Sequence, residues 1–243
     1  MVYKIRDLSK KFGKYYALKN IDLDIEQNEK IVIIGPSGSG KSTLLRCLNT
    51  LETPSNGKIL YHDMRLTEQT YKNIHGKIGM VFQNFQLFDN LTVIENLTLA
   101  PILNKIMSKE EAYKQAKEYL KQIHLEDKEK TYPKNLSGGQ KQRISIARTL
   151  IKNPKILILD DSSSALDMET ESKLQNSLKN RMKDSTVFLI AQRISAVMDS
   201  DKIIVLDNGE IAAIGTHKEL IKNCEIYRSI AISQLGEEAV LNV

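Results

Sequence analysis

The chain has 243 residues, which is enough for one large domain or for one domain with lobes. Its net charge of +5 is modest, and Lys and Glu are interspersed along the chain, which argues against a surface built to bind nucleic acid. No apolar run approaches the ~20 residues that span a bilayer, and the first residues lack the apolar core of a secretory signal.

The first thirty residues are predicted to form antiparallel strands. Residues 3–5 and 21–25 alternate polar and apolar side chains, as half-exposed strands do. Phe12 is expected in the loop between them. Its ring either packs on the hairpin or stacks on the adenine of a nucleotide, and the pattern leaves both interpretations open.

Residues 35–43, GPSGSGKST, carry the strongest signal in the chain, and we call them the phosphate loop. They follow the apolar β-branched run 31–34 and precede a run compatible with a helix, which we expect at 44–51. The pattern G-x-x-x-x-G-K-[S/T] between a strand and a helix is that of a phosphate-binding loop. Glycines let the backbone wrap closely around a phosphate, and the helix N-terminus adds its N–H groups and its positive dipole end.

Nine residues of this loop are therefore predicted to contact a nucleotide. Lys41 can reach the β- and γ-phosphates, and the Ser42 hydroxyl can ligate Mg²⁺. The predicted contacts are Gly35, Pro36, Ser37, Gly38, Ser39, Gly40, Lys41, Ser42 and Thr43.

The middle of the chain is predicted to combine sheet strands with an inserted helical lobe. A strand is expected at 58–61, and a short buried strand at 78–82 is followed by Gln83, where parallel α/β sheets bind ligands. Residues 85–135 contain a capping box at 108–111 and a helical apolar stripe, which together indicate a mainly helical segment.

Two further features point to anion and metal chemistry. Residues 137–140, SGGQ, precede a helical run and form a second Gly-rich helix N-terminus, hence a second possible anion site. The apolar strand 156–159 ends in Asp160 and Asp161, whose carboxylates suit Mg²⁺ binding and water activation. An acidic cap between strand and loop is the alternative interpretation of these two residues.

The last third is predicted to complete the sheet. Residues 186–191 form another buried strand, which ends at Gln192. Asn208 and Gly209 between two apolar runs predict a hairpin, and a capping box at 216–219 predicts a C-terminal helix. The two cysteines and four histidines have no metal-ligand spacing, so we expect packed thiols in a reducing compartment.

The order of these motifs resembles that of the ATP-binding-cassette (ABC) ATPases. The phosphate loop, Gln83, LSGGQ at 136–140, ILILD at 156–160 and SALD at 164–167 follow one another over essentially the whole chain. The resemblance implies a P-loop α/β fold with a mainly parallel core sheet flanked by helices, an antiparallel β-lobe and an inserted helical lobe. We expect a single domain over 1–243, divided into a β-lobe with the phosphate-loop core (1–84), a helical lobe (85–150) and the rest of the core with a C-terminal helix (151–243).

The resemblance also implies roles for single residues, with ATP and Mg²⁺ as cofactors. Phe12 would stack on adenine, and Gln83 would contact Mg²⁺ or the attacking water. Asp160 would hold Mg²⁺ through water, and Asp167 would lie at a dimer interface. The residues that would cap the γ-phosphate held by a second subunit are Ser137, Gly138, Gly139 and Gln140.

Two positions depart from the family pattern. The residue after Asp160 is usually a Glu that acts as general base, and here it is Asp161, which is shorter by about 1.5 Å. The switch-loop residue is usually His, and here it is Gln192, whose amide cannot carry a proton-linked charge. With Gln83 and Lys41 these residues form the predicted catalytic set. The two changes predict intact Mg-ATP binding with weak intrinsic hydrolysis.

Different segments of the chain resemble two kinds of ABC transporter. Residues 81–101 and 132–143 resemble ATPases of polar amino-acid importers, whereas the last third resembles cassettes of ABC exporters, especially degenerate members of heterodimers, with a join near 145–155. Because the segment after Gln83 contacts the membrane subunits in this family, the importer interpretation is favoured. It implies a polar amino acid as substrate and a location on the cytoplasmic face of the cell membrane.

The importer interpretation also implies partners and leaves alternatives. The partners would be a second ABC ATPase subunit in a homo- or heterodimer, transmembrane permease subunits and a substrate-binding protein, and not nucleic acid. The first alternative is a hydrolysis-impaired cassette that acts as an ATP-dependent clamp in a heterodimer. The second is an ABC protein that acts on ribosomes or DNA, which usually carries two cassettes or long insertions.

Overall fold

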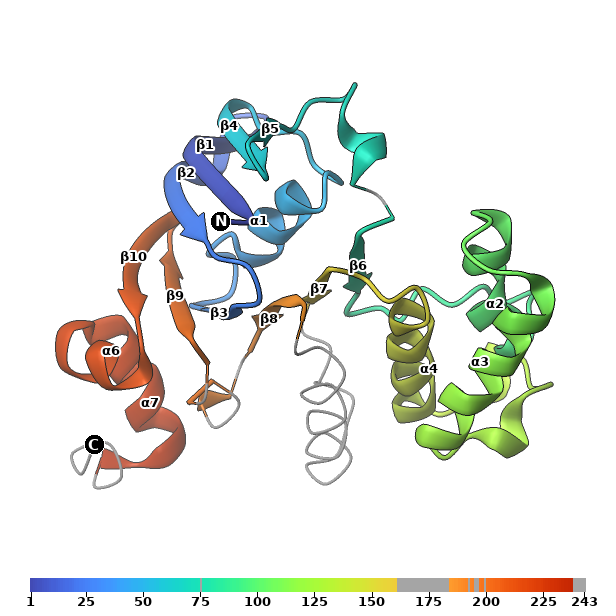
Figure 1. Cartoon of the computed structure of the whole chain (residues 1–243). Coiled ribbons are helices and arrows are strands. Elements are labelled where there is room, and N and C mark those ends of the chain that lie inside the picture. The colour runs from blue at the N-terminus through green and yellow to red at the C-terminus, as the bar shows by residue number, and fades with distance from the viewer. Residues whose placement is uncertain (75, 161–183, 192, 195–196, 199, 238–243) are drawn as a thin grey trace.

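The computed structural model describes residues 1–74, 76–160, 184–191, 193–194, 197–198 and 200–237. Its strands form a four-stranded antiparallel sheet and a six-stranded, mainly parallel sheet (Figure 1). The antiparallel sheet has the order β2 (Tyr15–Ile25), β1 (Tyr3–Phe12), β4 (Asn56–Tyr61) and β5 (Met64–Arg65). The other sheet has the order β10 (Glu210–Gly215), β9 (Lys202–Asp207), β3 (Lys30–Ile34), β8 (Thr186–Ile190), β7 (Ile156–Leu159) and β6 (Ile78–Val81).

The parallel strands are almost entirely apolar because their side chains are buried on both faces of the sheet. Strands β3, β6, β7, β8 and β9 run parallel, and β10 is antiparallel at one edge. Near-continuous apolar runs such as Ile31–Ile34 and Ile156–Leu159 are typical of such strands. The register pairs Val81 with Leu159 and Leu159 with Leu189, so the carboxyl ends of β6, β7 and β8 meet at one edge.

Alternate residues of the core strands contribute to two different hydrophobic cores. Ile31, Ile33 and Phe188 pack with the antiparallel sheet and with α1 (Lys41–Leu48). Val32 and Leu189, on the other face, pack with α6 (His217–Asn223) and α7 (Glu225–Leu235). The core sheet is therefore a middle layer, with the β-lobe and α1 on one side and the C-terminal helices on the other.

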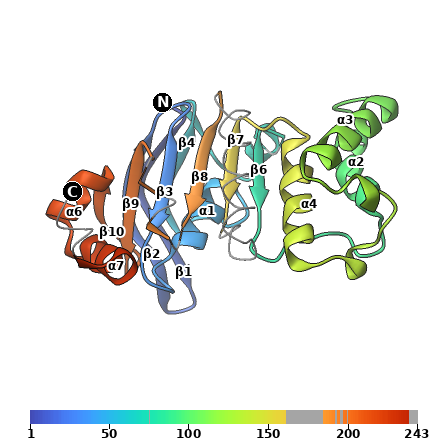
Figure 2. The same ribbon diagram turned by 90° about the horizontal axis from the view of Figure 1, so that it is seen from below.

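A helical lobe is inserted between the neighbouring strands β6 and β7. It contains α2 (Val93–Leu103), α3 (Lys109–Gln122) and α4 (Gly138–Leu150), with short 3₁₀ turns at η2 (Glu126–Lys128) and η3 (Pro133–Asn135). These helices share a hydrophobic cluster of their own. Figure 2 shows the lobe beyond β6, at the opposite end of the sheet from β10, α6 and α7.

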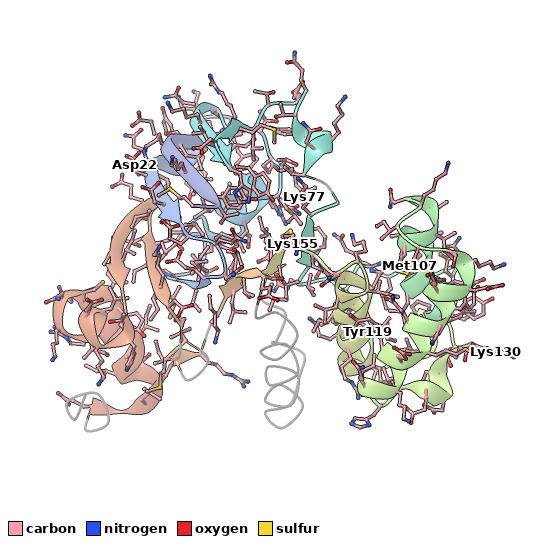
Figure 3. All side chains as sticks on the ribbon, in the orientation of Figure 1. Asp22, Lys77, Met107, Tyr119, Lys130 and Lys155 are labelled. Atoms are coloured by element: carbon pink, nitrogen blue, oxygen red, sulfur yellow. The ribbon has the colours of Figure 1, made fainter. Side chains whose placement is uncertain are left out.

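Specific contacts hold the lobe together and join it to the sheet. The Tyr119 hydroxyl of α3 donates to the Leu150 carbonyl of α4 at 3.1 Å (Figure 3). Where the chain returns to the sheet, the Lys155 amide donates to the Lys77 carbonyl at 2.9 Å. Gly79 of β6 allows close approach of α4, because an added Cβ would lie 2.6 Å from Thr149 Cγ2.

Several element boundaries differ from the sequence predictions. Phe12 is the last residue of β1 and pairs with Tyr15, so the connecting turn is only Gly13 and Lys14. The first helix begins at Lys41 and ends at Leu48, three residues earlier than predicted, with Asn49 as its C-cap. The C-terminal segment forms two helices separated at Cys224, and η1 (Tyr71–Asn73) follows β5.

Other predictions are confirmed by the described residues. Asn208 and Gly209 have φ angles of 47° and 83° and connect β9 to β10 in a two-residue hairpin turn. Thr216 and Ser108 cap α6 and α3 with reciprocal capping boxes. Within the described ranges, no helix has the length and apolar character needed to cross a bilayer.

Candidate functional site

A cavity of about 840 Å³ opens at the carboxyl edge of the parallel strands. Residues that follow β3, β6, β7 and β8 line it, namely Gly35, Gln83, Asp160 and Ala191. The β1–β2 hairpin and α7 complete the wall. The lining residues from these two elements are Phe12, Tyr15, Ala17, Ile230 and Gln234. A ligand at this edge would contact the ends of several strands, as is usual for parallel α/β sheets.

Two glycines of the phosphate loop are required by its close packing. Gly35 and Gly40 have φ angles of 152° and 102°. A Cβ on Gly35 would overlap the Leu206 carbonyl oxygen, and one on Gly40 would overlap the Ala17 carbonyl oxygen. The loop therefore fits between β9, β2 and the start of α1 only with glycine at these two positions.

Lys41 lies over the loop that precedes it. Its ammonium donates to the carbonyl oxygens of Gly35 at 2.9 Å and Pro36 at 2.7 Å. A phosphate oxygen would make stronger, charge-assisted hydrogen bonds with this ammonium than a neutral carbonyl does. The side chain is thus placed to exchange loop carbonyls for the phosphates of a nucleotide in the cavity.

The side chains of Ser42 and Asp160, which both line the cavity, are hydrogen-bonded to each other. The Ser42 hydroxyl donates to Asp160 Oδ1 at 2.9 Å, and Asp160 is only 4% exposed. The Asp160 amide donates to the Val81 carbonyl at 3.0 Å, which fixes the backbone after β7. A buried carboxylate needs such partners, and it is also a hard oxygen donor for a cation.

The N-termini of the helices differ in their charge. The first turns of α2, α3, α6 and α7 each contain a glutamate, which complements the positive dipole end of the helix. Among the α-helices in the described part of the chain, α1 and α4 have no acidic residue there. These two helices begin at the phosphate loop and at residues 137–140, where the sequence predicts anion contacts.

Residues 137–140 do not reach the cavity around the phosphate loop within this chain. Ser137 is the N-cap of α4, and it exchanges hydrogen bonds with Gln140 in a capping box. None of these four residues is among those that line the cavity in the described structure. Ser137 and Gly138 are exposed, and the Phe85 ring is the nearest side chain to Gly138. The motif is therefore presented outward on the helical lobe.

Phe12 lies in the cavity wall and is 47% exposed. Lys10 places its ammonium 4.8 Å from the ring centroid. Of the two interpretations of Phe12, an exposed ring at the cavity agrees better with a stacking surface than with hairpin packing. Its contact with adenine stays a prediction.

The sequence analysis did not assign several of the cavity-lining residues to the site, among them Tyr15, Ile230 and Gln234. The Tyr15 hydroxyl donates to the Gly38 carbonyl at 3.4 Å, and Ile230 and Gln234 come from α7. The two-residue turn after Phe12 could have indicated Tyr15, because it places both aromatics at the same end of the hairpin. No local pattern indicates Ile230 or Gln234, since they approach the phosphate loop only through the fold.

The segment that follows Gln83 is held by the helical lobe. The Ser145 hydroxyl donates to the Phe85 carbonyl at 2.9 Å, and Arg148 donates to the carbonyl oxygens of Gln86 at 2.6 Å and Phe85 at 3.1 Å. Burial lowers the pKa of the Arg148 guanidinium, which nevertheless stays charged at neutral pH. Movement of α4 would therefore be transmitted to the chain next to Gln83.

Three of the predicted functional residues lie outside the described residues. They are Asp161 and Asp167, which follow Asp160 in sequence, and Gln192. Their roles continue to rest on the sequence alone. Within the described part, no cluster of three or more His, Cys, Asp or Glu could hold a metal ion.

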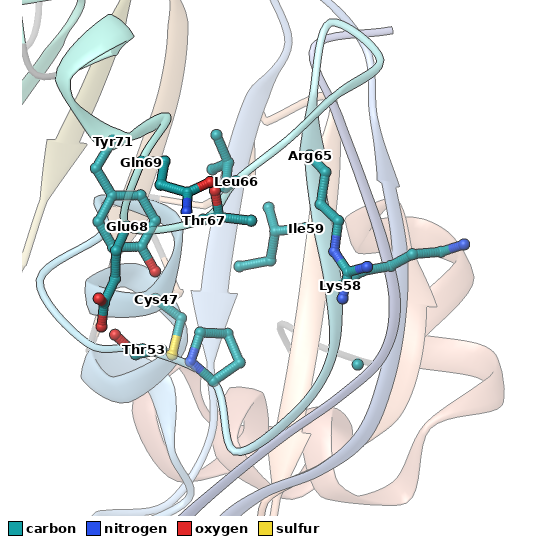
Figure 4. Close-up of a pocket in the computed structure, with 12 residues that line it drawn as sticks. Cys47, Thr53, Lys58, Ile59, Arg65, Leu66, Thr67, Glu68, Gln69 and Tyr71 are labelled. Atoms are coloured by element: carbon teal, nitrogen blue, oxygen red, sulfur yellow. The ribbon is translucent and has the colours of Figure 1, made fainter.

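A second cavity, of about 460 Å³, lies between the end of α1 and the strands β4 and β5 (Figure 4). Cys47 lies in its wall, and burial raises the pKa of this thiol to about 12. Such a thiol stays protonated and unreactive at neutral pH. Cys224 is buried as well, so both cysteines are free, packed thiols.

Comparison with known proteins agrees with the motifs. Residues 18–164, more than half of the chain, match the family model described as ABC transporter. The arginine transport ATP-binding protein ArtM of Bacillus subtilis is 42% identical over 221 residues, which cover 89% of this chain and 92% of that protein. The glutamine transport ATP-binding protein GlnQ of Escherichia coli is 40% identical and covers 90% of this chain and 93% of its own length.

A solved structure agrees with the fold. A dimeric ATP-binding cassette in a post-hydrolysis state with ADP and Pi is 37% identical, with a TM-score of 0.81 over 88% of this chain and 98% of that one. The similarity to the transport ATP-binding proteins spans about nine-tenths of the chain, so it continues beyond residues 145–155.

Proposed function

The chain belongs to the ABC transporter family, and we propose that it powers the import of a polar amino acid through separate membrane subunits. As a member of this family the chain is an ATPase that binds ATP. The relatives named for arginine and glutamine transport support the substrate class. The division into 1–84, 85–150 and 151–243 within one domain is part of the proposal.

One observation gives the main support for a nucleotide site. It is the Ser42–Asp160 hydrogen bond at the N-terminus of α1, a helix with no acidic residue in its first turn. At this point the phosphate loop, the α1 dipole and a buried carboxylate meet inside one cavity. The backbone N–H groups of the phosphate loop and the ammonium of Lys41 would hold the β- and γ-phosphates, because both lie at the N-terminus of α1. Phe12 would hold the adenine at the open end.

The residues present fit a magnesium ion. Ser42, Gln83 and Asp160 provide hydroxyl, amide and carboxylate oxygens, and a Mg²⁺ ion that keeps several waters needs only one or two carboxylates. When bound, the ion neutralises charge on the β- and γ-phosphates. Ser42 would ligate the ion, and Asp160 would hold it through water.

The remaining groups act on the attacking water. Gln83 would orient it with its amide, and Asp161 would accept its proton. Gln192 would contact the γ-phosphate with an amide in place of the usual imidazole. These roles follow from the matched motif positions. The shorter carboxylate of Asp161 and the neutral amide of Gln192 predict slow turnover of ATP.

The outward position of residues 137–140 supports a second subunit. These residues would close the ATP site of another cassette, so that two chains enclose two nucleotides head to tail. The apolar side chains of Phe88, Leu103 and Ile106 are exposed on the helical lobe, where membrane permease subunits would dock. The protein would then work on the cytoplasmic face of the membrane, with a binding protein that delivers substrate from the other side.

Reconstitution tests this function directly. The chain is combined with its permease in proteoliposomes, and ATP-dependent uptake of labelled arginine and labelled glutamine is measured. We expect uptake of at least one of them in the wild type and none with Lys41→Ala. Lys72→Ala, a surface lysine on η1, is the matched control and should behave as wild type.

A different outcome would contradict the proposed function. If the wild type binds ATP and dimerises but neither turns it over nor supports uptake, it is the hydrolysis-impaired clamp of the alternative interpretation. The relatives do not favour that outcome, because they are transport ATP-binding proteins and the neighbouring cassette was captured after hydrolysis.

A further inference from the structure

The C-terminal helix α7 reaches the nucleotide cavity from the far end of the sequence. Ile230 and Gln234 of α7 line the cavity together with Ala191 and Asp160. The helix is anchored by Tyr227 and Ala231, which are completely buried in the hydrophobic core between the sheet and the C-terminal helices. Gln234 therefore projects from a rigid element toward the carboxyl ends of β7 and β8.

Two contacts fix the orientation of α7. The Tyr227 hydroxyl is hydrogen-bonded to His217 Nδ1 at 2.7 Å, which joins α7 to α6. Arg228 Nε donates to the Ile221 carbonyl at 2.6 Å. These contacts fix α7 against α6 about two turns before Gln234.

Gln234 holds the backbone of the segment that leaves β8. Its Oε1 accepts a hydrogen bond from the Ile194 amide at 2.8 Å. The Ile194 side chain is completely buried in the same core as Tyr227. Ile194 lies three residues after Ala191, which lines the cavity, and two residues after Gln192 in the sequence.

We propose that Gln234 is a positioning residue for ATP hydrolysis: its amide oxygen fixes the backbone amide of Ile194, three residues after Ala191 in the cavity wall. A displacement of about 1 Å in a side chain that contacts the γ-phosphate, the role proposed for Gln192, is enough to lower the rate of hydrolysis greatly. This inference rests on the proposed ATPase site, because it gives α7 a role only if ATP occupies the cavity. The helix then contributes to turnover although it lies outside every motif of the sequence.

The side chain can be tested without disturbing the core. Gln234 is exposed to the cavity, so Gln234→Leu removes the acceptor oxygen but no buried packing. Gln234→Glu keeps an acceptor oxygen at the same reach. Ser233→Ala, on the solvent side of the same helix, is the matched control.

The first readout is amide hydrogen exchange at Ile194 in the full chain, which does not depend on activity. We expect Gln234→Leu to accelerate this exchange about 3- to 10-fold, the range expected for loss of one hydrogen bond, while Gln234→Glu and Ser233→Ala stay close to wild type. Unchanged exchange in Gln234→Leu would overturn the inference. A chain without ATP turnover would contradict the proposed function and leave this readout intact.

The second readout separates positioning from simple structure. In the wild-type background, Gln234→Leu should lower kcat about 3- to 10-fold with KM for ATP nearly unchanged. In a Gln192→Ala background the same substitution should have no further effect, because the segment then lacks the amide that would contact the γ-phosphate. An equal fall in both backgrounds, or a fall of the same size in Ser233→Ala, would refute the proposal.

Discussion

At the scale of single residues, the site is organised by a buried carboxylate next to a hydroxyl. Asp160 would be costly to bury without a donor, and Ser42 supplies one at 2.9 Å. Lys41, one residue earlier, is bonded to loop carbonyls that are weaker partners than phosphates. Both contacts can be replaced by those of a bound nucleotide and its cation.

Asp160→Asn tests the role of the carboxylate. The substitution preserves shape but removes the charge, so the Mg²⁺ concentration that gives half-maximal ATPase activity should rise about 10- to 100-fold, as for other residues that hold a metal indirectly. A magnesium titration of steady-state turnover measures this shift. Asp63→Asn, whose carboxylate is mostly exposed, is the control, and an equal shift in both variants would contradict the assignment.

Asp161→Glu combined with Gln192→His tests the predicted weakness of hydrolysis. The longer carboxylate recovers about 1.5 Å of reach, and a misplacement of ~1 Å can cost on the order of 100-fold in rate. Steady-state turnover of the double variant should therefore exceed that of the wild type. Adding Lys41→Ala must abolish the gain if it arises at this site, and no gain at all would refute the prediction.

At the scale of elements, α4 connects two parts of the proposed mechanism. Its N-terminus presents residues 137–140, and its Ser145 and Arg148 hold the carbonyl oxygens just after Gln83. Phe85 and Gln86 have φ angles of 39° and 48°, a region that non-glycine residues seldom adopt. Such a conformation persists only where surrounding contacts fix it.

Arg148→Met tests this connection. The substitution keeps much of the packing but leaves the carbonyl oxygens of Phe85 and Gln86 without their charged donor, which should lower the free energy of unfolding by about 1.5–3 kcal/mol. Urea unfolding measures the loss. Arg65→Met, at an exposed arginine of β5, should change it by less than about 0.5 kcal/mol. Equal effects of both variants would show that the contacts to this segment contribute nothing.

The pairing of α6 with α7 predicts a pH dependence of stability. Burial lowers the pKa of His217, with a smaller contribution from Lys218, and the pKa of its partner Tyr227 is raised to about 12. At His217 the unfolded state therefore binds a proton more readily than the folded state. The contribution of this residue to stability is complete above the unfolded histidine pKa of about 6.5 and is lost as the pH drops through the lower folded pKa.

The measurement is urea unfolding of His217→Gln and wild type between pH 8 and about 5, a range centred on the ordinary histidine pKa. Glutamine does not titrate, so the stability of the variant should decline less steeply below pH 6.5. His124→Gln, at an exposed histidine, is the matched control. Identical slopes for His217→Gln and wild type would contradict the prediction.

At the scale of the whole molecule, the phosphate loop and the signature at 136–140 belong to different parts of the fold. The loop is built on the sheet between two hydrophobic clusters, whereas the signature begins a helix of the lobe beyond β6. Within one chain the signature does not line the nucleotide cavity in the described structure. In the proposed function a second subunit would complete the site, and the solved cassette of similar fold is dimeric.

Mixing two inactive variants tests this arrangement. Lys41→Ala should inactivate the phosphate loop, and Ser137→Arg should block the signature, so neither variant alone should turn over ATP. In a mixture, dimers of one subunit of each kind contain one intact composite site and should recover part of the activity. ATPase assays over a range of mixing ratios measure this recovery, and its absence would mean that both motifs act within the same subunit.

The amino-acid sequence by itself determined the phosphate loop, the polar residues at the ends of β6 and β7 and the insertion of a helical lobe. These features depend on local spacing and periodicity, because an apolar strand followed by glycines and a helix start has one main structural solution. The length of β1, the division of the C-terminal segment into α6 and α7, and the end of α1 were decided by pairing and packing with distant segments.

Only the tertiary structure decided which residues share the cavity. Tyr15 reaches Gly38 across the hairpin, and Gln234 reaches Ile194 from the last helix, because strand order brings the ends of β3, β7 and β8 together below α7. Likewise, the outward direction of residues 137–140 depends on how α4 packs against β6, which no spacing in the sequence encodes. Local chemistry thus determined what the site can bind, and long-range packing determined which residues complete it.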